Sequence, residues 1–404
     1  MGNILNLIYD DEQVKSADVS NYMDTYLFIN NYKLQHIDKI DEVNGKKCFY
    51  IYFHQDYFYH RIKNFGGLPL SQKVINELKK YENFNVIFIN DSESDKDDAI
   101  ILLEDEVKKN GLNPNQFYIL NWNQNLNESK IRHNSQINVH TMNRGDCVVS
   151  NSFSKFKFDF KKEHKEYFFM NHNRNVKSHR FFTLCLLKKY NLLNDTDWSW
   201  LRGYQLKERF MDDNNNLTPN YYFESFNSDF LIDIKDEIKY FSVIDKKKSV
   251  YEESYEIDKP PYDIDWDKMW SMNTYSNSYI NIVGETNFEN TNVVIVCEKS
   301  YIPFYYYQMP IIVASPYHIK KMRELYDLDF FDDLINHGYD NECDNNKRLL
   351  MIVNELKRLH DKKDEVIDFY FKNEHRFIEN KNKILNMRNR NKIDSDFFQK
   401  LINE

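Results

Sequence analysis

A charged pair, Glu298-Lys299, stands where one apolar run ends and a predicted helix begins. The apolar run is residues 293–297, and the helix is predicted from Ser300, with Pro303 in its first turn. Charges at a turn from a strand to a helix lie at the carboxyl edge of a sheet, where open α/β sheets bind ligands. A carboxylate there can accept both hydroxyls of a ribose, and an ammonium can neutralise a phosphate. Taken alone, such a pair is more simply a solvated turn, and only its combination with other features favours binding.

A second cluster, rich in basic residues, follows a predicted strand at residues 167–170 and leads into a predicted helix at residues 181–190. Backbone amides and the helix dipole already favour an anion at a helix amino terminus, so guanidinium groups there could clamp a diphosphate in a bidentate manner. The alternatives are a solvated basic turn or a contact with nucleic acid. The basic residues are Arg174, Lys177, His179 and Arg180.

The elements that must position these residues alternate between strands and helices. β-branched and aromatic runs predict strands at residues 48–53, 85–90, 117–121, 137–140, 279–283 and 310–314. Helical spacing predicts helices at residues 70–81, 99–109, 317–326, 348–359 and 365–377. This alternation indicates an α/β fold with parallel sheets. A linker at residues 153–165 divides the chain into domains at 1–160 and 161–375, followed by a helical tail at 376–404.

Composition sets further bounds on the class of protein. A chain of 404 residues favours two domains, and 41% hydrophobic residues suffice for folded cores. The net charge of −9 predicts no bulk attraction to nucleic acid or to an anionic membrane. No window approaches the roughly 18 apolar residues that span a bilayer. The 5 cysteines are scattered without a Cys-x-x-Cys pair, which favours a reducing cytoplasm over a disulfide framework.

The order Glu285, Glu298-Lys299, Pro303 and then residues 309–313 resembles the donor-binding core of the fucosyltransferase-like glycosyltransferases. It is especially similar to the glycosyltransferases encoded by phages and large DNA viruses, over residues 167–380. The resemblance implies a GT-B-like fold, with two Rossmann-like domains facing a cleft and C-terminal helices. It also implies an inverting, metal-independent transfer of a sugar from a nucleotide-diphosphate sugar to an acceptor hydroxyl. A viral chain would then act in the host cytoplasm.

The resemblance also assigns roles to residues. Residues 161–375 would bind the nucleotide sugar, with Glu298 on the ribose and Lys299 on the leaving diphosphate. Glu285 would position the sugar or balance its oxocarbenium-like charge. True fucosyltransferases usually carry Asn-Ser after the first Glu, where this chain has Thr286-Asn287, so the sugar is not implied. The diphosphate contacts would be Asn173, Arg174, His179 and Arg180.

The catalytic base is expected in the first domain, which by the same resemblance holds the acceptor. A base must reach the acceptor hydroxyl on the side of the sugar opposite the diphosphate. Residues 48–53 form the clearest strand of that domain, and the polar loop after it supplies Asp56, the preferred base, and His54. Solvated loop polarity is the alternative reading. The rivals are His60 in the same loop and Asp91 and Glu93 after the next strand.

No metal or cofactor is expected beyond the nucleotide-sugar co-substrate. The triplets of Asp263, Asp265 and Asp267 could hold a divalent ion, but such triplets arise by chance among 63 acidic residues. The expected partners are a nucleotide sugar and a glycan or other hydroxyl acceptor, with nucleic acid only as acceptor. Two alternatives stay open: a viral glycosyltransferase acting on DNA bases, and a catalytically inactive binding or structural protein that keeps the fold.

Overall fold

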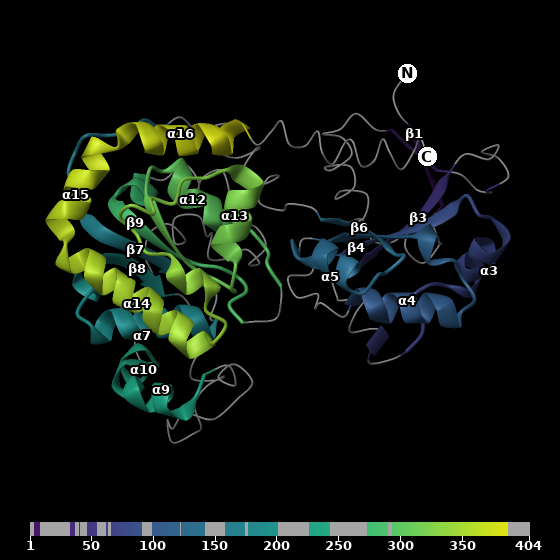
Figure 1. The fold of residues 1–404 in the computed structure, drawn as a ribbon, viewed down its shortest axis with the longest axis horizontal. Coiled ribbons are helices and arrows are strands. Elements are labelled where there is room, and N and C mark those ends of the chain that lie inside the picture. Colours follow the sequence, from purple (N-terminus) through teal and green to yellow (C-terminus); the bar gives the residue numbers. More distant parts are fainter. Residues whose placement is uncertain are drawn as a thin grey trace, which may run out of the picture. The chain divides into compact units, whose positions relative to one another are not determined.

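The computed structural model forms two compact units (Figure 1). Unit 1 comprises residues 1–143, 291–295 and 387–404, and unit 2 comprises residues 144–290 and 296–386. The residues that the structure describes are 4–8, 33–36, 40, 47–54, 62–63, 66–90, 99–121, 123–141, 158–173, 177–200, 226–242, 273–289 and 293–386. The segment 293–295 belongs to unit 1 through the backbone of Val294, which bonds with the Gln124 amide at 2.8 Å and the Asn123 side chain at 3.1 Å.

Unit 1 is built on a parallel sheet of six strands in the order β2-β1-β3-β4-β5-β6. The strands are β1 (Ile4–Ile8), β2 (Lys33–His36), β3 (Cys48–His54), β4 (Phe84–Asn90), β5 (Phe117–Asn121) and β6 (Asn138–Thr141), and the helices are α3 (Gln72–Lys80), α4 (Ala99–Lys109) and α5 (Leu126–Arg132). All four strands and both helices predicted in this half are confirmed within a few residues.

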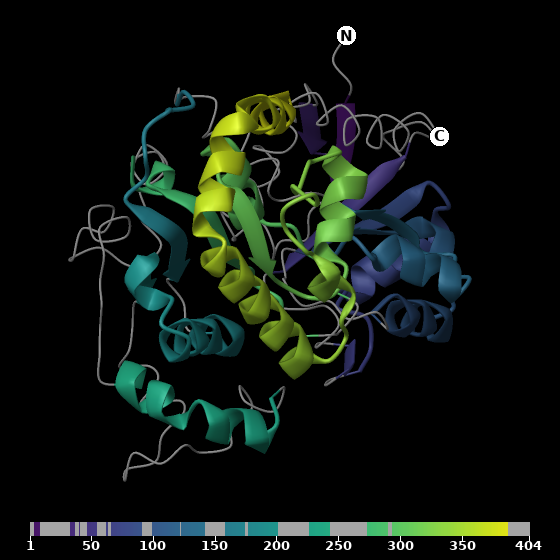
Figure 2. The same ribbon diagram turned by 60° about the vertical axis from the view of Figure 1, so that its left-hand side comes forward.

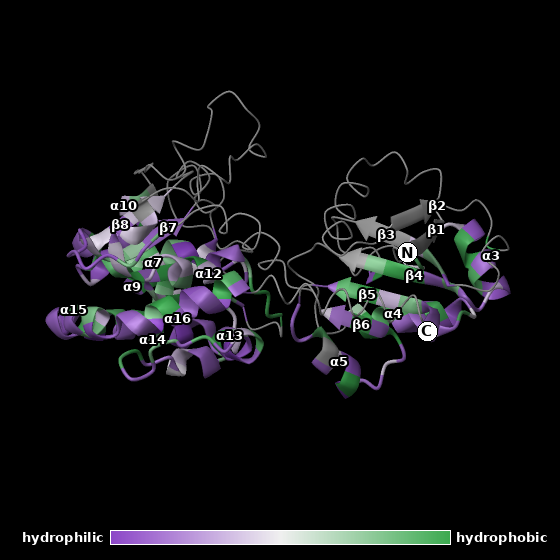
Figure 3. Cartoon of the chain, turned by 90° about the horizontal axis from the view of Figure 1, so that it is seen from above, coloured by the Kyte–Doolittle hydropathy of each residue, from purple (hydrophilic) through white to green (hydrophobic). Residues whose placement is uncertain are grey.

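The core of unit 1 follows from strands that are buried on both faces. Central strands of a parallel sheet have helices over both faces, so they read as continuous apolar runs. Accordingly Phe84, Val86, Ile87 and Phe88 of β4 are all nearly inaccessible to solvent. Figure 3 shows this as hydrophobic colouring along β4 and β5.

Unit 2 is built on a parallel sheet of four strands in the order β10-β9-β7-β8. The strands are β7 (Tyr167–Asn173), β8 (Thr196–Trp200), β9 (Ser278–Gly284) and β10 (Met309–Val313). Pro310 is tolerated in β10 because this strand lies at the edge of the sheet, where a missing N–H breaks no ladder. With two parallel sheets, the predicted α/β class with two Rossmann-like units is confirmed.

The helices of unit 2 refine several predicted boundaries. They are α7 (Ser178–Lys189), α9 (Ser228–Asp233), α10 (Lys235–Ser242), α12 (Glu298–Tyr305), α13 (His318–Tyr326), α14 (Asn345–Asp361), α15 (Lys363–Lys372) and α16 (Glu374–Leu385). The single helix predicted at residues 365–377 is wrong, because α15 ends at Lys372 and α16 starts at Glu374, with Asn373 between them. The C-terminal helices α14, α15 and α16 follow one another around unit 2 (Figure 2), where α16 packs on α12 and α14 packs on α7 and β10. None of the described helices is long and apolar enough to cross a membrane.

We expect Gln116 to be a main polar contributor to the stability of unit 1. Its buried side-chain amide lies 3.3, 3.0 and 2.8 Å from the carbonyl oxygens of Leu78, Tyr81 and Phe84. Gln116→Leu should lower the opening free energy of the β4 and β5 amides, measured by native-state hydrogen exchange, by about 1–3 kcal/mol, because buried carbonyls lose their donor. Gln72→Leu, on the exposed face of α3, is the control and should change it by less than about 0.5 kcal/mol. Equal effects of the two variants would contradict this assignment.

Candidate active site

The carboxyl edge of the unit 2 sheet is where two helices begin. Helix α7 starts at Ser178, a few residues after β7 ends at Asn173. Helix α12 starts at Glu298, beside Glu285, the residue that follows the last residue of β9. Both helices therefore present their first-turn amides at this edge, where an anion is favoured. Arg180 lies in the first turn of α7 and Lys299 in the first turn of α12, although residues 293–297 before α12 form no strand and α12 begins at Glu298 rather than at Ser300.

Glu285 is a buried carboxylate, only 1% exposed, that fixes the start of α12. Its Oε2 lies 2.7 Å from the Cys297 thiol and 3.1 Å from the Thr286 amide nitrogen, and its Oε1 accepts from the Ser300 hydroxyl. A buried charge is tolerated only when hydrogen bonds replace its water. These contacts assign Glu285 to positioning α12, and its role toward the sugar stays a prediction.

Two residues that the sequence analysis did not single out as site residues extend this network. His318 Nε2 lies 3.0 Å from the Ser300 hydroxyl and 3.9 Å from Glu285 Oε1. Burial lowers the pKa of His318, although Glu285 and Asp340 act in the opposite direction, so the ring is neutral at pH 7. Asp340 accepts from the Ile319 and Lys320 amides at 3.0 Å each and so caps α13.

Glu298 and Lys299 form an ion pair at the start of α12. The Lys299 ammonium lies 2.7 Å from Glu298 Oε1 and 3.3 Å from Cys297 Sγ, and its side chain stays 34% exposed. Burial acts to lower the pKa of Lys299, but attraction by Cys297, Glu298 and Glu285 outweighs it, so the pKa is raised. The nearby charge of Arg180 acts against this attraction. Lys299 is therefore a permanent cation that is accessible to a ligand.

Arg180 is held against the backbone at the end of β9. Its Nε donates to the Gly284 oxygen at 3.0 Å, and its Nη2 donates to the Glu285 oxygen at 2.9 Å. Gly284 is required here, because a Cβ at this position would meet Arg180 Cγ at 2.7 Å and Asn173 Oδ1 at 3.1 Å. Asn173 is in turn tied to Asn171 by a hydrogen bond of 2.6 Å. The guanidinium is thus a fixed charge, confined to this edge of the sheet.

His179 contributes shape and a hydrogen bond rather than charge. Burial, followed by the charge of Arg180, holds the pKa of His179 well below its usual range, so the ring is neutral. Because the Glu285 carbonyl can only accept, Nε2 carries the proton and donates to it at 2.8 Å. The His179 ring stacks on the Phe288 ring, with 5.1 Å between their centroids. The Arg348 guanidinium lies 4.2 Å from the centroid of the Phe288 ring. His179 therefore stiffens the segment that follows β9.

The other predicted site residues are less completely described. Arg174 and Asp56 lie outside the described residues, as do the rivals His60, Asp91 and Glu93. His54 is the last residue of β3, at the carboxyl edge of its own sheet as predicted, but its side chain is not described. The base assignment thus stays a prediction.

A buried histidine–carboxylate pair in unit 2 has no counterpart in the sequence analysis. His172 Nε2 of β7 lies 3.2 Å from Asp197 Oδ2 of β8, and both side chains are under 5% exposed. Neither ring nitrogen of His172 makes a hydrogen bond to a described residue, so the contact with Asp197 is a close approach without hydrogen-bond geometry. Residues 196–200 were not predicted as a strand, so nothing in the sequence indicated that Asp197 is buried in the sheet. No group of three potential metal ligands is found among the described residues.

We expect Glu285→Gln to destabilise α12 specifically. The amide loses the charge that its donors stabilise and places an N–H₂ group against donors, so the opening free energy of the α12 amides should fall by about 1.5–3 kcal/mol. Glu298→Gln, which weakens the partly exposed pair with Lys299, should change it by less than about 1 kcal/mol. Native-state hydrogen exchange resolved to α12 measures both. A larger loss in the Glu298 variant would show that the buried network does not hold the helix.

No protein-family model and no curated protein sequence match this chain. Among solved structures, it is similar to a mutant of T4 phage BGT in complex with UDP-glucose, with a TM-score of 0.37 and 11% identity over 100% of both chains. Two further structures are T4 phage BGT with its UDP-glucose substrate, at a TM-score of 0.34, and the DNA modifying enzyme beta-glucosyltransferase, at 0.33, each with 11% identity over 100% of both chains. At TM-scores this low, the similarity supports no inference about activity.

Proposed function

We propose that the protein is a glycosyltransferase that moves a sugar from a nucleotide-diphosphate sugar to an acceptor hydroxyl. The observation that carries this proposal is the meeting of two helix amino termini, with Arg180 and Lys299 in their first turns, at one carboxyl sheet edge. Two like charges held close together favour an anion that neutralises both. A diphosphate has the charge and the paired oxygens to do so. The order of the motif residues adds the resemblance to fucosyltransferase-like enzymes.

In this proposal the protein accelerates transfer chiefly by stabilising the leaving diphosphate. Preorganised charges and amides lower the energy of developing negative charge without reorganising during the reaction. Lys299 and the α12 amides would meet one phosphate, Arg180 and the α7 amides the other, and Arg174 would add to the same cluster. Glu298 would turn from Lys299 to the ribose hydroxyls once the phosphate occupies the ammonium.

The remaining features of the proposal follow from the family resemblance. Transfer would be inverting, with Asp56 or His54 in unit 1 taking the proton of the acceptor hydroxyl. Glu285 would act on the sugar through its hold on α12. The acceptor would be a glycan or another compound with a hydroxyl group, and the proposal does not specify the donor sugar.

We expect Lys299→Met to weaken binding of free UDP or GDP. The methionine fills the same space but loses a charge-assisted contact worth roughly 1.5–3 kcal/mol. Isothermal titration calorimetry of the full chain with both diphosphates measures the change. Lys320→Met is the matched control, because this exposed lysine of α13 pairs only weakly with Glu324, at 3.9 Å. Equal affinity of the two variants for the diphosphates would contradict the assignment of the diphosphate to this edge of the sheet.

A further experiment distinguishes a glycosyltransferase from a catalytically inactive protein that keeps the same fold. A thermal-shift screen of nucleotide sugars should show stabilisation by one donor, since a ligand that binds only the folded state raises the melting temperature. Hydrolysis or transfer of that donor would then establish an enzyme. A chain that responds to no donor would be a binding or structural protein that keeps the fold.

We expect transfer to proceed unchanged in a chelator. The proposed catalysis rests on Arg180, Lys299 and helix amides, which supply the positive charge that a divalent ion supplies elsewhere. Activity should therefore be equal with and without EDTA in a metal-depleted buffer. Loss of activity in EDTA with rescue by magnesium or manganese would bring Asp263, Asp265 and Asp267 back as ligands.

A further inference from the structure

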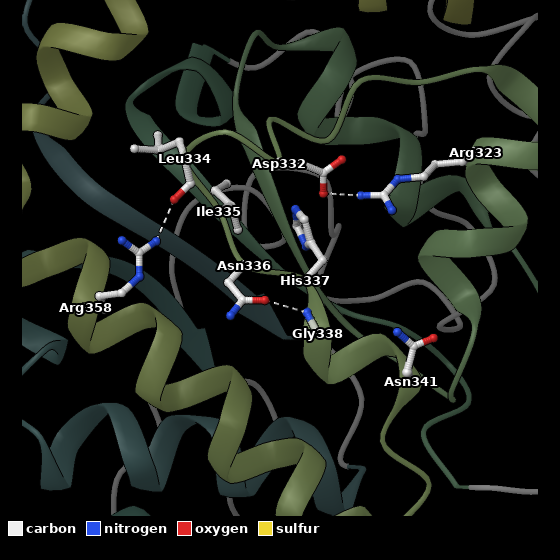
Figure 4. Close-up of a pocket in the computed structure, with 9 residues that line it drawn as sticks. All are labelled: Arg323, Asp332, Leu334, Ile335, Asn336, His337, Gly338, Asn341 and Arg358. Atoms are coloured by element: carbon white, nitrogen blue, oxygen red, sulfur yellow. Dashed lines mark hydrogen bonds and ion pairs between the residues drawn. The ribbon is translucent and has the colours of Figure 1, made fainter.

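A pocket of about 460 Å³ lies between α13 and α14 and the segment that joins them. Its lining comes from Arg323 of α13, Arg358 of α14 and, in the segment between these helices, Asp332, residues 334–338 and Asn341. Figure 4 shows the two guanidinium groups on opposite sides of the segment that carries Asn336, His337 and Gly338. The volume falls within the range of about 300–1,000 Å³ that is usual for sites of small ligands. The pocket plays no part in the proposed transfer.

The pocket reaches from Arg358, in the last turn of α14, to Asn341, beside the Asp340 that caps the start of α13. At the start of α14, Arg348 donates to the Ala314 oxygen, just after β10 ends. At the other end, His360 contacts Phe168 near the start of β7 and lies 2.7 Å from Asp195, just before β8. Arg358 is two residues from His360 and therefore lies toward the amino edge. Lys299 is not among the residues that line the pocket, so we expect a ligand here to leave a diphosphate at Lys299 in place.

The charges around the pocket cancel. The Arg323 guanidinium lies 2.5 Å from Asp332 Oδ1, and the Arg358 guanidinium forks onto Glu355 at 2.6 and 2.8 Å. Burial lowers the pKa of His337 to about 4, so this ring carries no charge at pH 7. Two cations are thus matched by two carboxylates. Neither a phosphate nor a metal ion finds a net field of opposite sign.

The same ion pairs hold hydrogen-bonding groups in fixed positions. Arg358 Nη2 donates to the Leu334 oxygen at 2.6 Å, and Asn336 Oδ1 accepts from the Gly338 amide at 2.9 Å. Among the described residues, Arg358 Nη1, Asp332 Oδ2, the Asn336 amide nitrogen and the Asn341 side chain have no hydrogen-bond partner. These hydrogen-bond donors and acceptors around the pocket are therefore available to a ligand.

We propose that this pocket binds a neutral, polyhydroxylated ligand, namely a saccharide ring, at a site separate from the donor site. A sugar hydroxyl donates and accepts at once, so it suits adjacent guanidinium, carboxylate and amide groups. Leu334, which is half-buried, adds aliphatic surface for the C–H face of the ring. Preorganisation by the ion pairs reduces the ordering cost of binding. The site would hold a glycan near the enzyme or report on its presence.

The test uses the full-length chain and saturation-transfer NMR with the methyl glycosides of glucose, galactose, mannose and fucose, alongside uridine and inorganic phosphate. We expect at least one glycoside to bind and phosphate not to bind at this pocket. Asn341→Leu removes an amide that bonds to no described residue, and Arg358→Lys keeps the charge beside Glu355 but loses the fork. Each variant should weaken glycoside binding about tenfold, the effect of one hydrogen bond to a well-placed group.

The matched control is Arg376→Lys, which disrupts an equally strong fork onto Asp329 and Asp333 outside the pocket. It should leave glycoside binding unchanged, and none of the three variants should alter UDP binding. The proposal is overturned if no methyl glycoside binds or if Asn341→Leu and Arg358→Lys bind it as the parent chain does. It is also overturned if phosphate or uridine competes for the pocket. UDP binding is measured separately, so failure here leaves the proposed transfer untouched.

Discussion

The site in unit 2 depends on one buried carboxylate. Glu285 stands directly after β9 and binds three donors, two of which belong to the first turn of α12 or the residue before it. Removing a carboxylate from water costs several kcal/mol, and only donors in fixed positions offset that cost. The end of β9, the start of α12 and the neutral His318 ring are therefore joined in one hydrogen-bond network. This network, rather than the contacts of Lys299 itself, places Lys299 at the edge of the sheet.

A second consequence concerns charge at that edge. Arg180 is fixed by two backbone carbonyls and Lys299 pairs with Glu298, so both cations lie at this edge of the sheet. The neutral state of His179 and His318 keeps further positive charge out of the same region. In the proposed site, Glu298 balances Lys299 when no ligand is bound, and the charge of Arg180 adds to the attraction for an anion. An exchange of partners, in which Glu298 gives up Lys299 to a phosphate, costs little because the pair is partly exposed.

The sequence carried enough information for most strands and for the charged edge, because both are local signals, but β1 and β2 were not predicted. Runs such as 85–90 and 279–283 are apolar throughout, and Glu298-Lys299 adjoins such a run in the chain. β8 was missed because Asp197 and Ser199 interrupt its apolar pattern, although their side chains are buried in the sheet. The break between α15 and α16 at Asn373 contains no glycine or proline, so the sequence does not indicate it. His318, Asp340 and the pair of His172 with Asp197 act through contacts between distant segments, which no spacing along the chain reveals.

The direction of the strands explains why unit 2 can carry two sites of opposite character. Helix amino termini gather at the carboxyl edge, so uncompensated N–H groups and positive dipole ends accumulate there and select an anion. The same helices reach the amino edge with their carbonyl ends, where a cation is favoured and an anion is not. Arg323 and Arg358 lie in the later turns of α13 and α14, and each is neutralised by a nearby carboxylate. The pocket beside these two ion pairs is left with hydrogen-bonding capacity but no net charge. In the two proposals, the strand direction gives the carboxyl edge an anion, and the paired arginines give the pocket a neutral, polar ligand.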